Sequence, residues 1–535
     1  MNLLSRHIQS LLLILPGVAY CHVGAACSGY DDGRVEQAIS AACSGQEYRV
    51  ELQGSAASGV TPLWLNANKY GLSSTAEHYG YTRFAVVRPM TPDTLRKWAV
   101  GYGADVAYLA ADNHTAAATA NTLFVQQMYA EVRWLKGVLT VGSKYYPMEL
   151  KNSRLSSGSQ CFGINARPVP QVRLALPDYW TVPILRGWLH LKGHLAYGMM
   201  TDDSWQHDFT ERKRKYADHV FYHSKAGYLK VGKQGKPFSL EAGLEMASTF
   251  GGTAYRPDGY GGMEKIENAN NLKAFWQAFI PGGGDATETD YRNMEGNHLG
   301  SLLLRFNYDR QNWGVSVYAD KFFEDQSAMF QIDYDGYGSG ADWDKRERAH
   351  VFMYDFKDMM LGAEVRLKRC SYLRNVVVEY LYTKYQSGPI YHDHTPSMSD
   401  HVSGLDDFYN HSIFTGWQHW GQVMGNPLYR SPIYNTDGEI RVENNRFKAW
   451  HFGMDGGLGR HLDYRILATW QEGLGTYYMP FTKKRENASL LVEASYRFAA
   501  PPLQGLSVKA AWGMDSGEIL GDNQGVQLTI GYTWR

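Results

Sequence analysis

The sequence predicts an all-β fold, a transmembrane outer-membrane β-barrel of antiparallel strands with long extracellular loops and a small N-terminal periplasmic element. Many segments alternate apolar and polar residues, and the chain begins with a segment typical of an export signal. No segment holds the roughly 20 apolar residues that a spanning helix needs. Because only helices and closed barrels satisfy every backbone polar group in lipid, such strands can cross a membrane only as a barrel.

Residues 1–25 are expected to be a secretory signal. The apolar run 11–15 is too short to span a bilayer, and the small residues 23–25 suit a cleavage site. Cys21 and Cys27 leave a lipid anchor open as an alternative, although Tyr20 is too large for the position before a lipidated cysteine and Gly24 stands where a site at Cys27 usually has leucine. We therefore expect a cleaved signal and export to the outer membrane.

Residues 26–60 follow the signal and have a less regular pattern. They form either a small periplasmic element or the first strand, and the barrel is expected to occupy residues 61–535. Cys27 and Cys43 are close enough in sequence to pair in an oxidising compartment, but free thiols are the favoured alternative.

The C-terminal segment Gly525–Arg535 has the clearest strand pattern. Apolar residues alternate there with small or polar ones, and the apolar face ends in Tyr532 and Trp534. Aromatic rings concentrate at the membrane–water boundary, so this pattern is typical of a lipid-facing strand. One or two further strands are expected before residue 90 and four between 450 and 513, and the others lie at 101–111, 123–141, 184–199, 220–232, 238–250, 299–307, 313–323, 328–334, 350–356, 359–368 and 372–386. The total is about 16 to 18 strands, within the range of known barrels.

Short turns alternate with long connections along the chain, as periplasmic turns and extracellular loops do. The longest irregular stretches are 251–298 and 387–444, and their Trp, Tyr and Phe content argues against disorder. Within the first stretch, residues 271–280 are expected to form a short helix that ends at the Pro-Gly run 281–284.

Composition and motifs exclude several functions. The formal net charge is -1, so nothing indicates a nucleic-acid partner. The chain has no nucleotide-binding glycine loop and no serine-hydrolase elbow, since Gly513–Gly517 places its serine one position late. We therefore expect no catalytic residues and no cofactor. An outer-membrane hydrolase remains a third alternative, because such an enzyme can set Ser, His and Asp on strands without a local motif.

One cluster resembles a metal site, namely His392-Asp393-His394 with Asp400 and His401. Alternate residues of a strand share a face, so His392 and His394 could reach one ion. A solvated polar loop accounts for the same residues, and we expect no metal site.

Aromatic density in the long loops favours a glycan-binding surface. Flat apolar rings flanked by amide and imidazole groups suit sugars, which present C–H faces and hydroxyl edges. The candidate contact residues are Tyr409, Asn410, Trp417, His419, Trp420 and Tyr429 in the second long loop and Trp276 in the first. Alternatively, these aromatics pack the loop on itself as a lid over the pore.

Several short strings between residues 60 and 475 carry a family resemblance. They are Thr61-Pro62-Leu63-Trp64-Leu65, Gln126-Gln127-Met128-Tyr129, Leu155-Ser156-Ser157-Gly158-Ser159, Gly296-Asn297-His298-Leu299-Gly300, Phe323-Glu324-Asp325-Gln326-Ser327, Gln386-Ser387-Gly388-Pro389 and Met424-Gly425-Asn426-Pro427-Leu428. In this order the strings resemble the Wzi family of capsule-assembly outer-membrane proteins, in its Bacteroidetes form.

The resemblance implies a barrel of about 18 strands that binds capsular or surface polysaccharide, with a pore blocked by loops and a periplasmic helical element. The leading hypothesis is thus a non-enzymatic, monomeric, polysaccharide-binding barrel in the lipid bilayer of the outer membrane. The alternative is a porin-like channel for sugars or other small solutes. A channel should conduct in planar bilayers, whereas a plugged lectin should not.

Overall fold

The computed structural model describes residues 45–90, 97–112, 122–280, 296–324, 335–337, 340–348, 357–392 and 401–535, and its part from residue 46 onward forms one compact unit. Several sequence predictions lie outside the described residues. These are the signal, the pair Cys27 and Cys43, and the strands expected at 328–334 and 350–356.

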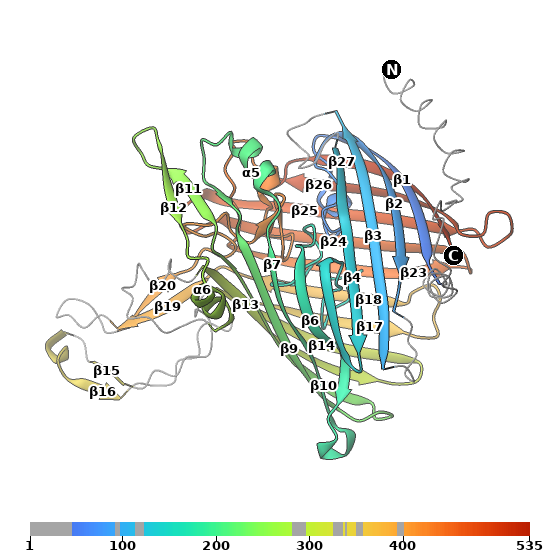
Figure 1. Cartoon of the computed structure of the whole chain (residues 1–535), viewed down its shortest axis with the longest axis horizontal. Helices are drawn as coiled ribbons and strands as arrows, with labels where there is room; N and C mark the ends of the chain where they lie inside the picture. The colour runs from blue at the N-terminus through green and yellow to red at the C-terminus, as the bar shows by residue number, and fades with distance from the viewer. Residues whose placement is uncertain are drawn as a thin grey trace, which may run out of the picture. The chain divides into compact units, whose positions relative to one another are not determined.

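Eighteen antiparallel strands form one closed sheet, in which β1 pairs with both β2 and β27 (Figure 1). This confirms the predicted fold class. The strands are β1 (Glu47–Ser58), β2 (His78–Arg88), β3 (Trp98–Ala111), β4 (Thr122–Trp134), β5 (Gly137–Ser143), β6 (Gln171–Thr181), β7 (Leu189–Met199), β9 (Phe221–Gly232), β10 (Phe238–Phe250), β13 (Asn297–Asp309), β14 (Trp313–Glu324), β17 (Met359–Leu367), β18 (Asn375–Tyr382), β23 (Phe447–Leu458), β24 (Leu462–Gly475), β25 (Pro480–Arg497), β26 (Leu506–Gly517) and β27 (Asn523–Trp534).

The alternation in the sequence separates the two faces of the wall. In β27, Val526 and Leu528 are about half exposed, whereas Gln527 and Thr529 are buried toward the lumen. At the seam, the Tyr48 and Trp534 rings of β1 and β27 stack with centroids 5.5 Å apart. Apolar residues therefore face outward and polar residues inward, as in a membrane barrel.

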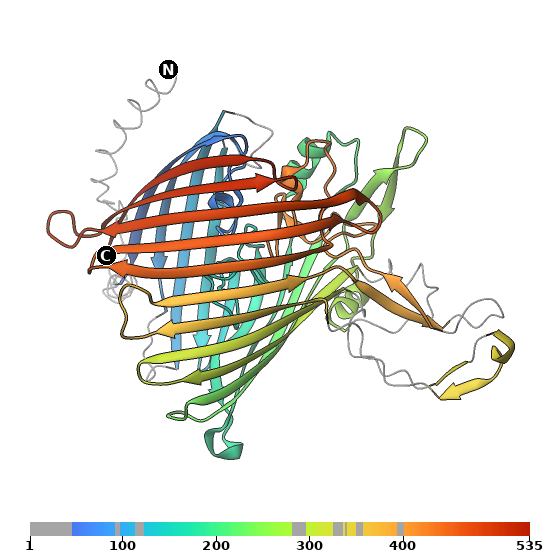
Figure 2. The ribbon, with the colours of Figure 1, turned by 180° about the vertical axis from the view of Figure 1, so that it is seen from behind.

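The two ends of the barrel differ in their connections. Turns such as 135–136, 310–312 and 459–461 lie at one end, and the long connections lie at the other, from which β11–β12 and β19–β20 project (Figures 1 and 2). We call these the short-turn end and the long-loop end.

The long connections contain short elements of their own. They are α4 (Leu63–Asn66), α5 (Asp203–Thr210), β8 (Tyr216–Asp218), β11 (Thr253–Pro257), β12 (Met263–Glu267), α6 (Leu272–Phe279), β15 (Asp335–Tyr337), β16 (Arg346–Arg348), β19 (Ser387–His392), β20 (His401–Leu405), β21 (Gln418–His419) and β22 (Gln422–Val423). Within the described part, no helix is long and apolar enough to cross a membrane.

Two strand predictions differ from the structure. The single strand expected at 123–141 is the hairpin β4–β5, which turns at Leu135 with a positive φ of 55°. Strand β6 was not predicted, because Pro177 interrupts its pattern and the register shifts between Leu176 and Trp180. A proline that cannot donate to the ladder is tolerated at such a bulge.

Candidate functional site

Three long connections turn into the lumen rather than outward, and we call them together the plug. They are residues 59–77, 144–170 and 406–446, and most of their side chains are buried. The plug crosses the barrel, since it contacts Tyr222 of β9 on one side and Gln527 of β27 on the other. β9 and β27 lie on opposite sides of the closed sheet.

The 144–170 segment is fixed by two carboxylates of the wall. Glu379 of β18 is fully buried and accepts hydrogen bonds from the Ser156 hydroxyl (2.6 Å) and from the backbone N–H and hydroxyl of Ser157 (2.8 and 2.6 Å). Asp320 of β14 accepts from the Gln160 backbone (3.0 Å) and pairs with Lys151 (2.7 Å). Charged acceptors that hold backbone donors in a buried setting give strong, directional contacts.

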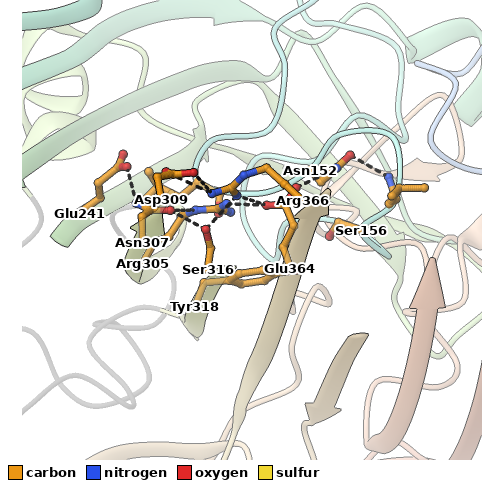
Figure 3. Close-up of polar contacts among 12 residues, drawn as sticks. Asn152, Ser156, Glu241, Arg305, Asn307, Asp309, Ser316, Tyr318, Glu364 and Arg366 are labelled. Carbon is orange, nitrogen blue, oxygen red and sulfur yellow. Dashed lines mark hydrogen bonds and ion pairs between the residues drawn. The ribbon is translucent and has the colours of Figure 1, made fainter. Parts of the chain in front are cut away.

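The wall around this segment carries a continuous polar network (Figure 3). Glu364 of β17 accepts from Arg305 of β13 and from Asn152 of the plug, the latter at 3.0 Å. Arg366 donates to the same carboxylate at 3.1 Å and to the Ser316 hydroxyl at 2.9 Å. A charge pair therefore links β13 to β17 across β14 on the inner face of the wall.

The α4 segment, residues 59–77, is fixed to β24, β26 and β27, which follow β18 and β23 around the wall. The Trp64 indole is 2% exposed and donates to Thr469 of β24 at 3.1 Å, and the Leu63 backbone donates to Asp515 of β26 at 2.9 Å. Lys69 donates to Gln527 of β27 at 2.7 Å. Burial lowers the pKa of Lys69 to about 7, with a further lowering from Lys509.

The 406–446 segment lies on the other two and interlocks with them. The Trp417 indole donates to the Cys161 carbonyl at 3.0 Å, and Asn426 donates to the Ser157 hydroxyl at 3.1 Å. A Cβ on Gly163 would meet the Gly425 carbonyl at 2.4 Å, so the two segments approach too closely for any larger residue.

At the long-loop end the structure contains a cavity of about 700 Å³, which we call the mouth cavity. Its volume falls in the range of ligand sites. It is lined by the chain around 406–412, by 439–443, by the β24–β25 connection and the start of β25, by Lys215, and by Asn297 and Glu324 at the ends of β13 and β14. The charged lining residues are Lys215, Glu324, Asp406, Asp407, Glu439, Arg441, Glu443 and Arg485.

The cavity also presents aromatic surface. Tyr478 is 66% exposed in the β24–β25 connection, and the Arg485 guanidinium lies 4.0 Å from the centre of the Phe481 ring. A flat ring beside carboxylate, hydroxyl and guanidinium groups can stack on a sugar and bind its hydroxyls or acidic substituents.

Lys215 is the lysine that lines the cavity. It is half-buried and donates to the His411 carbonyl. Burial lowers the pKa of Lys215 to about 8, while the nearby carboxylates of Asp407 and Glu439 oppose this shift and Arg256 and Arg441 add to it. Burial raises the pKa of Asp407, which accepts from Asn410 at 3.1 Å.

The predicted glycan-binding residues fall into two groups. Four of them, namely Tyr409, Trp417, His419 and Tyr429, lie inside the plug and are at most 1% exposed. In this conformation their rings offer no open face, and they pack against one another and the wall. Tyr409 stacks on Tyr429 at 4.0 Å, for example, and His419 contacts the Arg167 carbonyl at 2.8 Å.

The other three candidates lie closer to solvent. Asn410 lines the mouth cavity, where its amide pairs with the backbone N–H and carbonyl of Val442 (2.8 and 2.9 Å). Trp420 is half-exposed, with the Arg167 guanidinium 4.6 Å from its ring centre. Trp276 is 60% exposed on α6 and does not line the cavity. A direct sugar contact by any of the seven stays a prediction.

Sequence reasoning missed the cavity residues outside the second long loop. Lys215 precedes β9, whereas Tyr478 and Arg485 flank the start of β25, so no local motif joins them. The Tyr477-Tyr478 pair at a hairpin tip was the one usable signal.

The structure describes part of the metal-like cluster, and of that part only the backbone. His392 and His401 are register partners in β19–β20, and residues 393–400 lie outside the described part. Across the residues that are described, no group of three His, Cys, Asp or Glu side chains is placed to hold a metal ion.

No family model matches the chain, and no curated protein matches its sequence significantly. Among solved structures, the chain is similar to Wzi of Escherichia coli, described as an outer membrane protein involved in group 1 capsule assembly and a carbohydrate-binding β-barrel. The TM-score is 0.52 at 12% identity, over 93% of this chain and 86% of that one.

Two proteins of Pseudomonas aeruginosa are similar at lower scores. OprD has a TM-score of 0.42 at 10% identity, over 91% of this chain and 95% of its own. The outer membrane protein opdK has a TM-score of 0.42 at 10% identity, over 91% and 98%. At such identities the likeness to Wzi shows the fold alone. The chain therefore has the fold of an outer-membrane β-barrel.

Proposed function

We propose that this protein is a non-enzymatic carbohydrate-binding barrel that holds capsular or surface polysaccharide at the outer face of the outer membrane. In this proposal the sugar binds in the mouth cavity, and the plug supports the floor of that cavity. The observation that carries it is the pairing of a lumen crossed by three interlocked segments with a polar, aromatic-lined cavity above them.

The plug is what favours binding over transport. Its segments contact β9, β14, β18, β24, β26 and β27, with buried, charge-assisted hydrogen bonds at Asp320 and Glu379. A channel for sugars needs an open constriction, and moving these segments aside would strand buried donors and carboxylates at the energetic cost typical of unpaired polar groups. The wild-type protein should therefore give no sustained conductance steps in a planar bilayer.

Replacement of Arg485 by alanine tests the site. The guanidinium can donate to a sugar hydroxyl or carboxylate, so its loss should weaken binding about tenfold, the effect of one charge-assisted hydrogen bond. The probe is polysaccharide shed by the cells that make the protein, and the measurement is calorimetric titration of the full chain in detergent.

Arg460→Ala is the matched control, because Arg460 is exposed in a turn at the short-turn end. Equal affinities of both variants and the wild type would remove the mouth cavity as the site. Conductance steps in wild-type bilayers together with no polysaccharide binding would favour the channel instead.

The affinity for an acidic polysaccharide should depend on the charge of Lys215. Because burial lowers the pKa of this amine to about 8, Lys215 is a cation below that pH and loses its charge above it. An anionic sugar should therefore bind more weakly as the pH rises through 8, and the Lys215→Met variant should lack this step. A neutral polysaccharide serves as the comparison, and a step of equal size with the neutral sugar would contradict the role of Lys215.

A further inference from the structure

Helix α6 packs on the outer wall of the barrel and not over its lumen. The neighbouring strands show which way their side chains point. Tyr222 of β9 stacks on the plug residue Trp417 inside the barrel, so the next residue, His223, points outward. His223 lies 6.0 Å from Phe279 of α6 (ring centroids), and Phe250 of β10 packs against Ala274 and Ala278. Figure 1 shows α6 at the long-loop end.

The helix covers polar groups that lipid would not tolerate. His223 is fully buried although it points outward, and its Nδ1 contacts the Ala196 carbonyl at 2.9 Å. Lys225, also on the outward face of β9, donates to the carbonyl of Phe279 at the end of α6. A lysine on the lipid face destabilises a membrane barrel, most strongly at the bilayer midplane and less near the interface, so covering it has a clear benefit.

The opposite side of α6 is apolar and exposed. Leu272, Trp276 and Ile280 are 89%, 60% and 48% exposed. They are spaced four residues apart, so they form one stripe along the helix and its C-terminal end. The side of α6 toward the wall is also apolar, with Ala274 and Ala278 buried. A helix that is apolar on both sides and lies on a membrane barrel has a nonpolar environment on its outer side as well.

The height of α6 fits the upper edge of the bilayer. The outward residues Phe238, Leu240 and Leu244 of β10 are 54%, 42% and 37% exposed, whereas Phe250 is covered. At a rise of about 3.3 Å per residue and a tilt of about 40°, Phe250 lies on the order of 30 Å above Phe238. The apolar belt of such barrels is about 25 Å tall, with aromatic rings at both edges.

We propose that α6 is an interfacial helix, which inserts the stripe of Leu272, Trp276 and Ile280 into the outer leaflet where acyl chains meet head groups. The stripe continues the lipid-facing belt of β9 and β10, and Trp276 takes the position of a girdle aromatic. Lys273, exposed on the same helix, can extend its amine toward the head groups. Trp276 is then a lipid contact, and this role does not depend on the proposed glycan binding.

Spin labels test the proposal in the full chain. Cys21, Cys27, Cys43 and Cys370 are replaced by serine, the buried Cys161 is kept, and one new cysteine is introduced by Trp276→Cys, Leu244→Cys or Tyr260→Cys. Leu244 is the lipid-facing reference, and Tyr260, 97% exposed at the tip of β11–β12, is the aqueous reference. The labelled proteins are inserted into vesicles of palmitoyl-oleoyl phosphatidylcholine and probed with oxygen, which partitions into lipid, and with a water-soluble nickel chelate.

The label at position 276 should resemble that at 244, with an oxygen-to-nickel accessibility ratio several-fold above that at 260. A ratio equal to that at 260 would place the stripe in water, and protection from both reagents would place it under protein, so either result overturns the proposal. Heat-dependent electrophoretic mobility confirms that each variant is folded. Leu272→Cys provides a second position on the stripe if Trp276→Cys does not fold.

Discussion

Replacing Glu379 with alanine is expected to release the 144–170 segment of the plug from the barrel wall. The substitution leaves the donors of Ser156, Ser157 and Tyr318 buried without their acceptor. Each unsatisfied donor costs about 1 to 3 kcal/mol, so the free energy of unfolding should fall on the order of 3 kcal/mol or more. Urea unfolding of the protein in lipid vesicles measures this change.

The same variant should also conduct. Since the plug holds the lumen closed in our proposal, loosening one of its three segments should produce conductance steps in a planar bilayer that the wild type lacks. Glu518→Ala is the matched control. Glu518 is half-exposed in the β26–β27 connection, and its ion-pair partner among the described residues is Lys483. A Glu379→Ala protein as stable and as silent as that control would contradict the supporting role of Glu379.

The barrel could be predicted from the sequence because one physical rule acts on every strand. Lipid outside and water inside require alternate residues to be apolar and polar. The sequence of β27 alone therefore predicts that Leu528 faces lipid and that Thr529 faces the lumen. Errors occurred where another effect overrides the alternation. At β6 it is a proline with a bulge, and at Leu135 a tight turn inside an otherwise continuous apolar pattern.

The plug could not be predicted from the alternation of apolar and polar residues, because it is held by contacts between residues far apart in the sequence. Ser156 and Ser157 are small polar residues in an irregular segment, and only Glu379, more than 200 positions later, gives them a buried acceptor. No pattern within 144–170 itself shows that this segment folds inward, and only the family resemblance implied that loops block the pore. The mouth cavity has the same origin, since Lys215 and Arg485 belong to connections far apart along the chain.

The aromatic loop shows the limit of composition as evidence. The density of Trp and Tyr indicated either a sugar-binding surface or a self-packed lid. Both hypotheses rest on the same aromatic residues. The structure places Trp417 at 1% exposure against Tyr222 of the wall, while Trp420, three positions on, is half-exposed beside Arg167. The two tryptophans therefore allow packing and binding to be measured separately.

Trp417→Ala and Trp420→Ala are expected to separate the two roles. Removing the buried indole of Trp417 leaves a void between the plug and β9 and strands the Cys161 carbonyl, so the free energy of unfolding should fall by about 3 to 5 kcal/mol. Removing Trp420 forfeits its contact with Arg167, and the loss should be about 1 kcal/mol. Urea unfolding in vesicles gives both numbers.

Polysaccharide retention by cells that carry each variant then gives the second readout, normalised to the amount of folded barrel. If Trp420 contacts sugar, its loss should lower retention while stability stays near that of the wild type, whereas Trp417→Ala should lower retention only in proportion to the folded protein that is lost. Normal retention in Trp420→Ala would restrict the sugar contacts to the residues of the mouth cavity. A stable Trp417→Ala protein with low retention would mean that the plug opens to expose this ring, so that sugar binding and plug movement are coupled through a single side chain.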